Sequence, residues 1–174
     1  MDKIKYAYFA GFLDGEGTFT INKAYYKYQK RFNFFPAIQC GMADTEEQWK
    51  VLEELRDEFG GYLKRYPYRD KVRDRQRDLI FWRITTQKAR KCAEKLLSYL
   101  VVKRKQAEIL IKLAKFQGDR NKKKGRTRKL TDEEFNMRME LVKQIRQLNL
   151  RGMAAKYRQN WAAAETERSD TQKG

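Results

Sequence analysis

The sequence feature that most constrains this fold occurs twice: a helix-like pattern is followed by two strand-like patterns. The first copy lies within residues 2–42 and the second within residues 45–85. Apolar and polar residues alternate in the strand segments, so each strand should bury one face and expose the other. The chain is therefore predicted to be an α+β protein of order α-β-β-α-β-β-α, with a four-stranded antiparallel saddle sheet, helices on one face, an open polar face and extra C-terminal helices.

Local signals locate the ends of these elements. Thr45 and Thr131 each stand three residues before a Gln or Glu, the spacing of a helix capping box. Gly118 is expected to end a helix, leaving residues 119–130 as a basic loop, and Pro36 indicates an edge or bulge in its strand. The predicted elements are a helix over 2–14 ended by Gly15 and Gly17, strands over 18–23 and 31–42, a helix from Thr45 to Gly60, strands over 62–68 and 78–85, and helices from Thr86, Lys103 and Thr131.

The charge of the chain requires a polyanionic partner. Among its 174 residues are 40 Lys and Arg against 23 Asp and Glu, which gives a formal net charge of +17. No apolar run approaches 18 residues, which argues against a membrane and leaves nucleic acid as the expected partner. Cys40 and Cys92 have no paired spacing and are interpreted as buried thiols of an intracellular protein, in the cytoplasm of a prokaryote or in an organelle. The length predicts one domain over 1–152 and a C-terminal tail of doubtful order over 153–174.

Residues 9–17, with the sequence FAGFLDGEG, carry the chemistry. Ala7, Gly11 and Gly15 form a stripe of small residues at a spacing of four, which lets two helix backbones approach closely. If two copies of this helix cross on a twofold axis, Glu16 and its symmetry mate lie side by side and provide oxygen ligands suited to Mg²⁺. The chain has no His, so its chemistry is expected to use carboxylates, lysine and metal ions. The alternative interpretation of DGEG is a simple polar helix end.

The whole nonamer resembles the motif of the LAGLIDADG homing endonucleases. Because the motif occurs once, the resemblance implies the homodimeric branch, with Ala7, Gly11 and Gly15 at the interface. It implies metal binding at Gly15 and Glu16, catalysis by Glu16 and Lys103, and a structural role for Asp14. The implied metal is Mg²⁺, for which Mn²⁺ substitutes, whereas Ca²⁺ supports binding without cleavage.

One position departs from the family pattern. Where the family often has a glutamine that positions water after the second strand, this sequence has Met42 or Ala43. Asp44 or Gln39 could take its place, and the sequence leaves this choice open.

The resemblance further implies that double-stranded DNA binds the open sheet face in its major groove. The product would be a double-strand break with short 3′ overhangs in a long pseudo-palindromic site, made by an intron-encoded enzyme. The alternatives are an RNA-splicing maturase and a DNA-binding protein that does not cut. The residues predicted to bind nucleic acid are Thr20, Asn22, Tyr26, Tyr28, Arg31, Asn33, Gln39, Lys64, Tyr66, Arg69, Arg73, Arg75, Arg77, Lys122, Lys123, Lys124 and Arg126.

Overall fold

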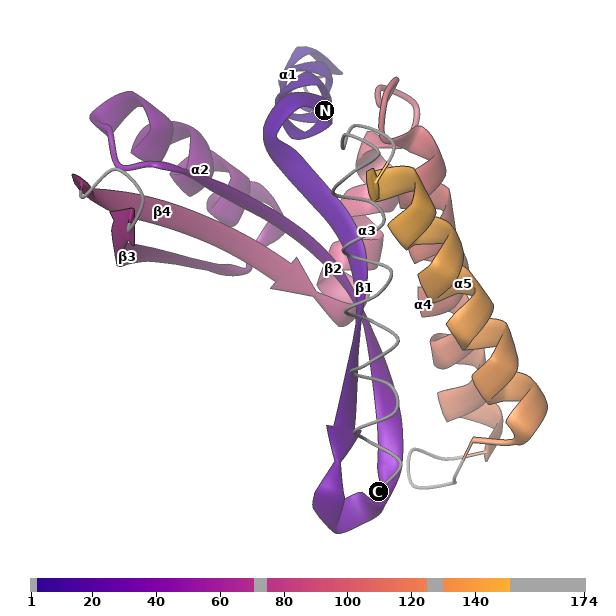
Figure 1. The fold of residues 1–174 in the computed structure, drawn as a ribbon. Helices are drawn as coiled ribbons and strands as arrows, with labels where there is room; N and C mark the ends of the chain where they lie inside the picture. The colour runs from indigo at the N-terminus through magenta and orange to yellow at the C-terminus, as the bar shows by residue number, and fades with distance from the viewer. Residues whose placement is uncertain (1–2, 71–74, 125–129, 151–174) are drawn as a thin grey trace.

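The computed structural model describes residues 3–70, 75–124 and 130–150 (Figure 1). The order of its elements confirms the predicted α+β architecture. Helices α4 and α5 follow the predicted α-β-β-α-β-β-α series. The elements are α1 (Lys3–Glu16), β1 (Gly17–Tyr26), the short 3-10 helix η1 (Lys27–Gln29), β2 (Arg31–Ala43), α2 (Glu46–Phe59), β3 (Tyr62–Asp70), β4 (Arg75–Thr85), α3 (Thr86–Leu96), α4 (Arg104–Lys124) and α5 (Asp132–Leu150).

The strands form one antiparallel sheet in the order β1-β2-β4-β3, which confirms the predicted sheet. Strands β2 and β4 are central, and they pair only from Ala37↔Thr85 to Ala43↔Leu79. Outside this short ladder the β1–β2 and β3–β4 hairpins diverge as two ribbons (Figure 1). The result is a strongly twisted sheet, and no helix of the described residues covers one of its faces.

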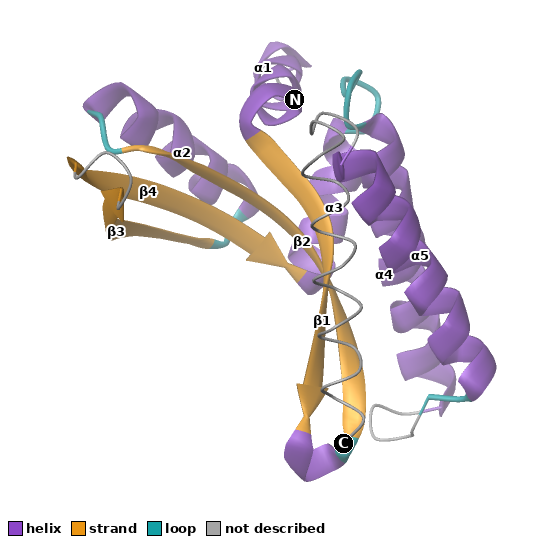
Figure 2. Cartoon of the chain, viewed as in Figure 1, coloured by secondary structure: helices purple, strands orange, loops and turns teal. Residues whose placement is uncertain are grey.

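The helices cover the opposite face and enclose the core. Helix α2 lies along the β3–β4 half, whereas α3 lies against β2 and β4, α4 against β1 and β2, and α5 against β1 (Figure 2). Alternate strand residues such as Phe19, Ile38 and Trp82 are fully buried under these helices. Burial of such side chains contributes roughly 1.5–3 kcal/mol each, so the alternation decides which face meets the helices. Within the described ranges, no helix is both long enough and apolar enough to cross a membrane.

The predicted helix caps are confirmed. The Thr45 hydroxyl accepts a hydrogen bond from the Gln48 amide at 3.3 Å and begins α2. At α5 the capping box is reciprocal, because the Glu134 amide donates to the Thr131 hydroxyl and the Thr131 amide donates to the Glu134 carboxylate. Helix α2 ends at Gly60, whose positive φ of 75° favours glycine.

Two predicted helix ends are wrong. Helix α1 continues through Gly15 and ends at Glu16, so Gly17 marks its end as predicted but Gly15 does not, and the acidic residue lies in the last helical turn. Helix α4 continues through Gly118 to Lys124, so the first half of the expected basic loop, residues 119–124, is helical. A glycine inside a helix costs only about 1 kcal/mol, and the packing of α4 against the core and α5 offsets that cost.

Pro36 lies in a central strand, yet it has a strand neighbour on one side only. It pairs with Ile21 of β1, whereas the ladder between β2 and β4 ends at Ala37. The β1–β2 register continues through this position, so the predicted bulge is absent there. At Pro36 the side of β2 that faces β4 is a local edge, as predicted. This fits proline, which has no backbone N–H to donate to a second strand.

Candidate functional site

Helix α1 has one buried face and one open face. Tyr6, Phe9, Ala10 and Leu13 enter the core, whereas Ala7, Gly11 and Gly15 are exposed, as are Ile4 (82%) and Tyr8 (52%). A Cβ atom added at Gly11 or at Gly15 would meet nothing within 4 Å. The fold of the single chain therefore gives no reason for glycine at these two positions.

Gly17 is different, because it is needed where helix α1 turns into strand β1. A Cβ atom there would lie 2.7 Å from the Leu13 carbonyl oxygen and 2.8 Å from Leu13 Cδ2. Only glycine allows the strand to begin so close to the last helical turn. This close junction holds the exposed Glu16 between the end of α1 and the start of the sheet.

The Asp14 carboxylate joins α1 to the segment that precedes α4. Its oxygens accept hydrogen bonds from the backbone amides of Val101, Val102 and Lys103 at 2.7, 3.1 and 2.8 Å. The carboxylate thereby satisfies three successive backbone N–H donors that would otherwise be unpaired at the start of α4. Asp14 is thus engaged by backbone, as expected for a structural acid.

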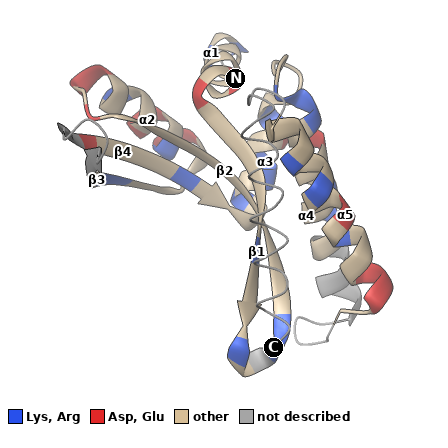
Figure 3. Cartoon of the chain, in the orientation of Figure 1, with Lys and Arg blue, Asp and Glu red and all other residues tan. Residues whose placement is uncertain are grey.

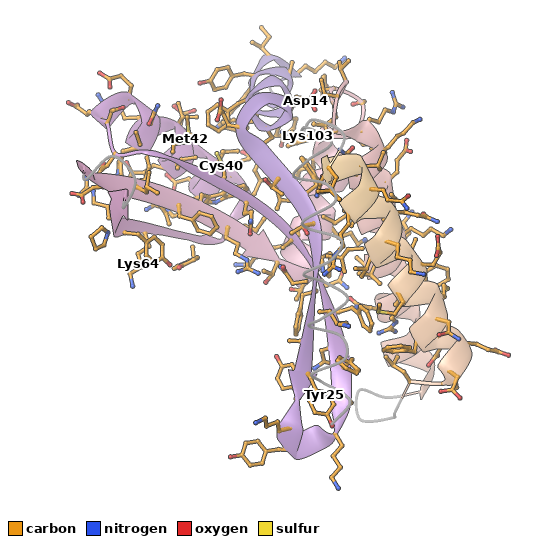
Figure 4. The ribbon with its side chains drawn as sticks, in the orientation of Figure 1. Asp14, Tyr25, Cys40, Met42, Lys64 and Lys103 are labelled. Carbon is orange, nitrogen blue, oxygen red and sulfur yellow. The ribbon has the colours of Figure 1, made fainter. Side chains whose placement is uncertain are left out.

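Lys103 makes the reciprocal connection to the end of α1. Its ammonium group donates to the carbonyl oxygens of Leu13 at 3.0 Å and Gly15 at 3.2 Å, beside Asp14 (Figure 4). Partial burial lowers the pKa of Lys103, while the charge of Asp14, the Cys40 thiol and the charge of Glu16 act against that shift. These contacts place a lysine ammonium group at the helix end that carries Glu16.

Cys40 lies under the same region on strand β2. Burial raises the pKa of its thiol to about 12, and the negative charge of Glu16 acts in the same direction. The thiol is therefore neutral at physiological pH and contributes packing rather than charge. Its register partner is Gly17, the first residue after Glu16.

The residues that could replace the family's water-positioning glutamine lie in different environments. Met42 follows Cys40 on the core face of β2 and is half-buried, and its thioether is at most a weak hydrogen-bond acceptor. Asp44 is bound to Arg65, with 2.6 Å between its carboxylate oxygen and Arg65 Nε. Gln39 lies on the open sheet face opposite Thr18.

A family model matches the part of the chain that contains most of α1, the sheet and Lys103. Residues 9–111 match the model of the LAGLIDADG endonucleases, which spans more than half of the chain. The chain belongs to the LAGLIDADG endonuclease family. No protein of curated function matches the sequence.

Solved structures with this LAGLIDADG fold agree with the assignment. One is the homing endonuclease I-CvuI in complex with its target, with 18% identity, a TM-score of 0.60 and coverage of 83% of this chain and 82% of that chain. The archaeal intron-encoded homing endonuclease I-Vdi141I, complexed with DNA, has 14% identity and a TM-score of 0.62 over 89% and 90%. I-SmaMI bound to cleaved DNA has 18% identity and a TM-score of 0.58 over 79% of this chain but 42% of that chain.

The open face of the LAGLIDADG sheet contains many of the residues predicted to bind nucleic acid. Strand register and burial place eight of them on this face or its rim: Thr20, Asn22, Tyr26, Arg31, Asn33, Gln39, Lys64 and Tyr66. Tyr28 is fully exposed in η1 at the tip of the β1–β2 hairpin. The side chains of Arg69, Arg73, Arg75, Arg77, Lys122, Lys123, Lys124 and Arg126 lie outside the described part of the structure.

Strand parity also identifies two open-face residues that the sequence prediction omitted. Thr18 pairs with Gln39, and Arg83 pairs with Gln39 from the other side. Arg83 alternates with the buried Trp82 and Ile84, and this signal could have identified it from sequence. The face is also less polar than predicted, because Tyr66 packs edge-on against Phe81 with ring centroids 6.2 Å apart.

Replacement of Asp14 by alanine should destabilise the fold. The substitution leaves three backbone amides without their carboxylate partner, so we expect the free energy of unfolding to fall by about 2 kcal/mol. Urea unfolding of the wild type, Asp14→Ala and Glu16→Ala would measure this, because the exposed Glu16 carboxylate receives no such hydrogen bonds from the described residues. Equal unfolding midpoints for Asp14→Ala and the wild type would contradict the structural role.

Proposed function

We propose that this chain is a divalent-metal-dependent, sequence-specific endonuclease that cuts double-stranded DNA as a homodimer. The observation that carries the proposal is the exposed Glu16 at the end of α1, beside the fixed ammonium group of Lys103. The family assignment supports the nuclease activity. The solved relatives support DNA as the substrate, since I-CvuI is described with its target and I-SmaMI with cleaved DNA.

The donor set fits a hard divalent cation shared between two chains. Glu16 offers exposed carboxylate oxygens, and the adjacent Gly15 carbonyl, which accepts one hydrogen bond from the Lys103 ammonium group, has a second lone pair for a cation. Among the described residues of one chain, no group of three or more His, Cys, Asp or Glu side chains could hold a metal ion. A second Glu16 from a partner would complete a site for Mg²⁺ or Mn²⁺. A bound cation would supply charge stabilisation at the scissile phosphate.

The homodimer is supported by the open face of α1 and by the lengths of the relatives. Ala7, Gly11 and Gly15 leave a smooth strip between the exposed Ile4 and Tyr8 side chains, which allows close approach of a second helix. The chain covers most of I-CvuI and I-Vdi141I but less than half of I-SmaMI. Two copies would bring two Glu16 residues and two Lys103 residues to one centre.

Lys103 would act on the phosphate as a fixed cation. Two of its three N–H donors point to the carbonyls of Leu13 and Gly15, which leaves one donor for a phosphate oxygen or a water molecule. Charge that develops on the phosphate is stabilised by a cation already held in place. Because either Met42 or Ala43 takes the position of the family glutamine, we propose that Glu16 and Lys103 orient the attacking water.

The distribution of charge supports binding on the open sheet face. Acidic residues gather on α2 and at the start of α5, which lie on the helical side (Figure 3). Strands β1 and β2 contain no acidic residue. The β1–β2 half of the open face therefore has no strand carboxylate that would repel phosphates, and its polar residues would lie in the major groove. An intron-encoded enzyme of this kind would act inside a prokaryotic cell or an organelle.

The direct test is cleavage of the uninterrupted exon junction of the host gene. Purified protein would be incubated with a duplex that spans this junction, in Mg²⁺, in Mn²⁺, in Ca²⁺ and in EDTA. We expect double-strand breaks with short 3′ overhangs in Mg²⁺ and Mn²⁺, and binding without breaks in Ca²⁺. Binding without breaks in every metal would indicate a protein that does not cut, and splicing of the intron RNA without DNA cleavage would indicate a maturase.

Binding to DNA should depend steeply on salt. Two chains carry a formal charge of +34, twice the +17 of one chain. With about ten phosphates neutralised, the logarithm of the binding constant should fall against the logarithm of salt concentration with a slope of roughly −9. Fluorescence anisotropy between low and moderate salt would measure the slope. A slope near roughly −2 would show that most of the basic residues are only solvated.

A further inference from the structure

Four polar residues form a row across all four strands of the open sheet face. Thr18 of β1 pairs with Gln39 of β2, Gln39 pairs with Arg83 of β4, and Arg83 pairs with Tyr62 of β3. Neighbours in such a row have side chains about 4.5–5.5 Å apart at Cβ, so they can act on the same ligand. Thr18 follows Glu16 by two residues, which puts this row next to the proposed cleavage centre.

Arg83, in the middle of this row, has a side-chain nitrogen, Nε, that is buried from solvent and makes no hydrogen bond to the described residues. Asn22 Nδ2, on the same face of β1, is in the same state. Buried donors are normally paired, so the described residues of the sheet leave both side chains without an acceptor, and a ligand on the open face can supply one when the side chains turn outward.

Arg65 shows that the sheet can satisfy an arginine elsewhere. It lies on the neighbouring strand β3 but on the opposite face, where its Nε is 2.6 Å from an Asp44 carboxylate oxygen. Its guanidinium also stacks over Trp49 at 4.3 Å from the ring centroid. Arg83 has neither kind of partner in the described structure, and its row contains no acidic residue.

We propose that Arg83 recognises a guanine base in the major groove, close to the centre of the target site, with Gln39 beside it. This inference rests on the proposed function. Guanine presents two acceptors, O6 and N7, to the major groove, and arginine donates to both from its planar fork. Arg83 lies in a central strand rather than at the rim of the sheet, so it faces base edges instead of the phosphate backbone.

The position of the row also predicts where the guanine lies. Thr18 lies two residues after Glu16, the last residue of α1, which is at most about 7 Å at about 3.3 Å per strand residue. This is about two base-pair steps of duplex at 3.4 Å each. Arg83 lies two strand spacings beyond Thr18, roughly 10 Å further at about 4.8 Å each, or about three more base-pair steps. The twofold axis repeats the contact, so the guanine should occur in each half-site, within about five base pairs of the dyad.

Selection from a random library tests this without knowledge of the natural target. A duplex library randomised over its central 30 or so base pairs would be bound in Ca²⁺ by the wild type, Arg83→Ala, Arg83→Gln and Arg65→Gln, then sequenced. We expect the wild type to enrich guanine at one symmetric pair of positions near the dyad, and Arg83→Ala to lose roughly tenfold discrimination there only. Arg83→Gln should shift the preference toward adenine, which glutamine recognises through N6 and N7.

Arg65→Gln is the matched control, and two separate results would overturn the proposal. Arg65→Gln removes the same charge from the other face, so it should retain the wild-type preference, and thermal unfolding would show that each variant is folded. An Arg83→Ala consensus equal to that of the wild type, or a uniform loss of affinity at every position, would overturn the proposal for Arg83. A wild-type protein that enriches no sequence would overturn the proposed function together with this inference.

Discussion

Replacing Glu16 by glutamine should abolish DNA cleavage and leave DNA binding intact. The glutamine keeps the size of the side chain but removes the negative charge from both halves of the proposed paired site, so divalent metal should bind poorly there. Loss of a metal removes several kcal/mol of charge stabilisation in the transition state. Because each 1.4 kcal/mol is tenfold in rate, we expect cleavage to fall by at least roughly a thousandfold. Affinity for DNA should stay equal or rise, since a carboxylate that repels the phosphates is gone.

The comparison needs two readouts and two further variants. Cleavage would be measured in Mg²⁺ and gel-shift affinity in Ca²⁺, for the wild type, Glu16→Gln, Asp14→Asn and Glu54→Gln. Glu54 is exposed on α2, so its substitution controls for the loss of one surface carboxylate. A wild-type cleavage rate in Glu16→Gln would show that the active-site assignment is wrong and that DGEG is only a helix end. If Asp14→Asn alone abolished cleavage with fold and dimer intact, the roles of the two acids would be reversed.

Replacing Gly11 by leucine should convert the proposed homodimer to monomer or aggregate. Two leucines would meet where two α1 helices cross, and overpacking of this kind costs typically 1–3 kcal/mol per substituted site, so about 2–6 kcal/mol for the dimer. The single chain should tolerate the change, because a Cβ atom at Gly11 meets nothing within 4 Å and leucine favours helix over glycine. Dimer stability and chain stability should therefore respond differently to the same substitution.

Sedimentation and unfolding separate these two effects. Sedimentation velocity of the wild type, Gly11→Ala and Gly11→Leu should show a graded loss of dimer as the side chain grows. Urea unfolding at a concentration where all three are monomeric should show no loss of stability in Gly11→Leu. A stable and fully active Gly11→Leu dimer would place the interface elsewhere. A Gly11→Leu chain that fails to fold would contradict the open face seen at this position of α1.

Much of the fold could be predicted because its signals are local. The capping residues Thr45 and Thr131 begin their helices as expected, and alternation in β1 and β2 assigns the core face. The predictions that failed concern helix ends at Gly15 and Gly118. A glycine disfavours helix by only about 1 kcal/mol, which packing with the rest of the molecule can exceed. Sequence alone gives no measure of that packing.

The sequence by itself determined the family motif, the α+β order, the excess of positive charge and the choice of Glu16 and Lys103 as candidates. Only the tertiary structure decided that Asp14 binds the backbone amides of residues 101–103, and that Arg83 stands on the open face with an unpaired donor while Arg65 is paired. The physical reason is one of range. Helix caps and strand alternation depend on residues a few positions apart, whereas these contacts depend on how distant segments pack and on which donors the packed fold leaves unsatisfied.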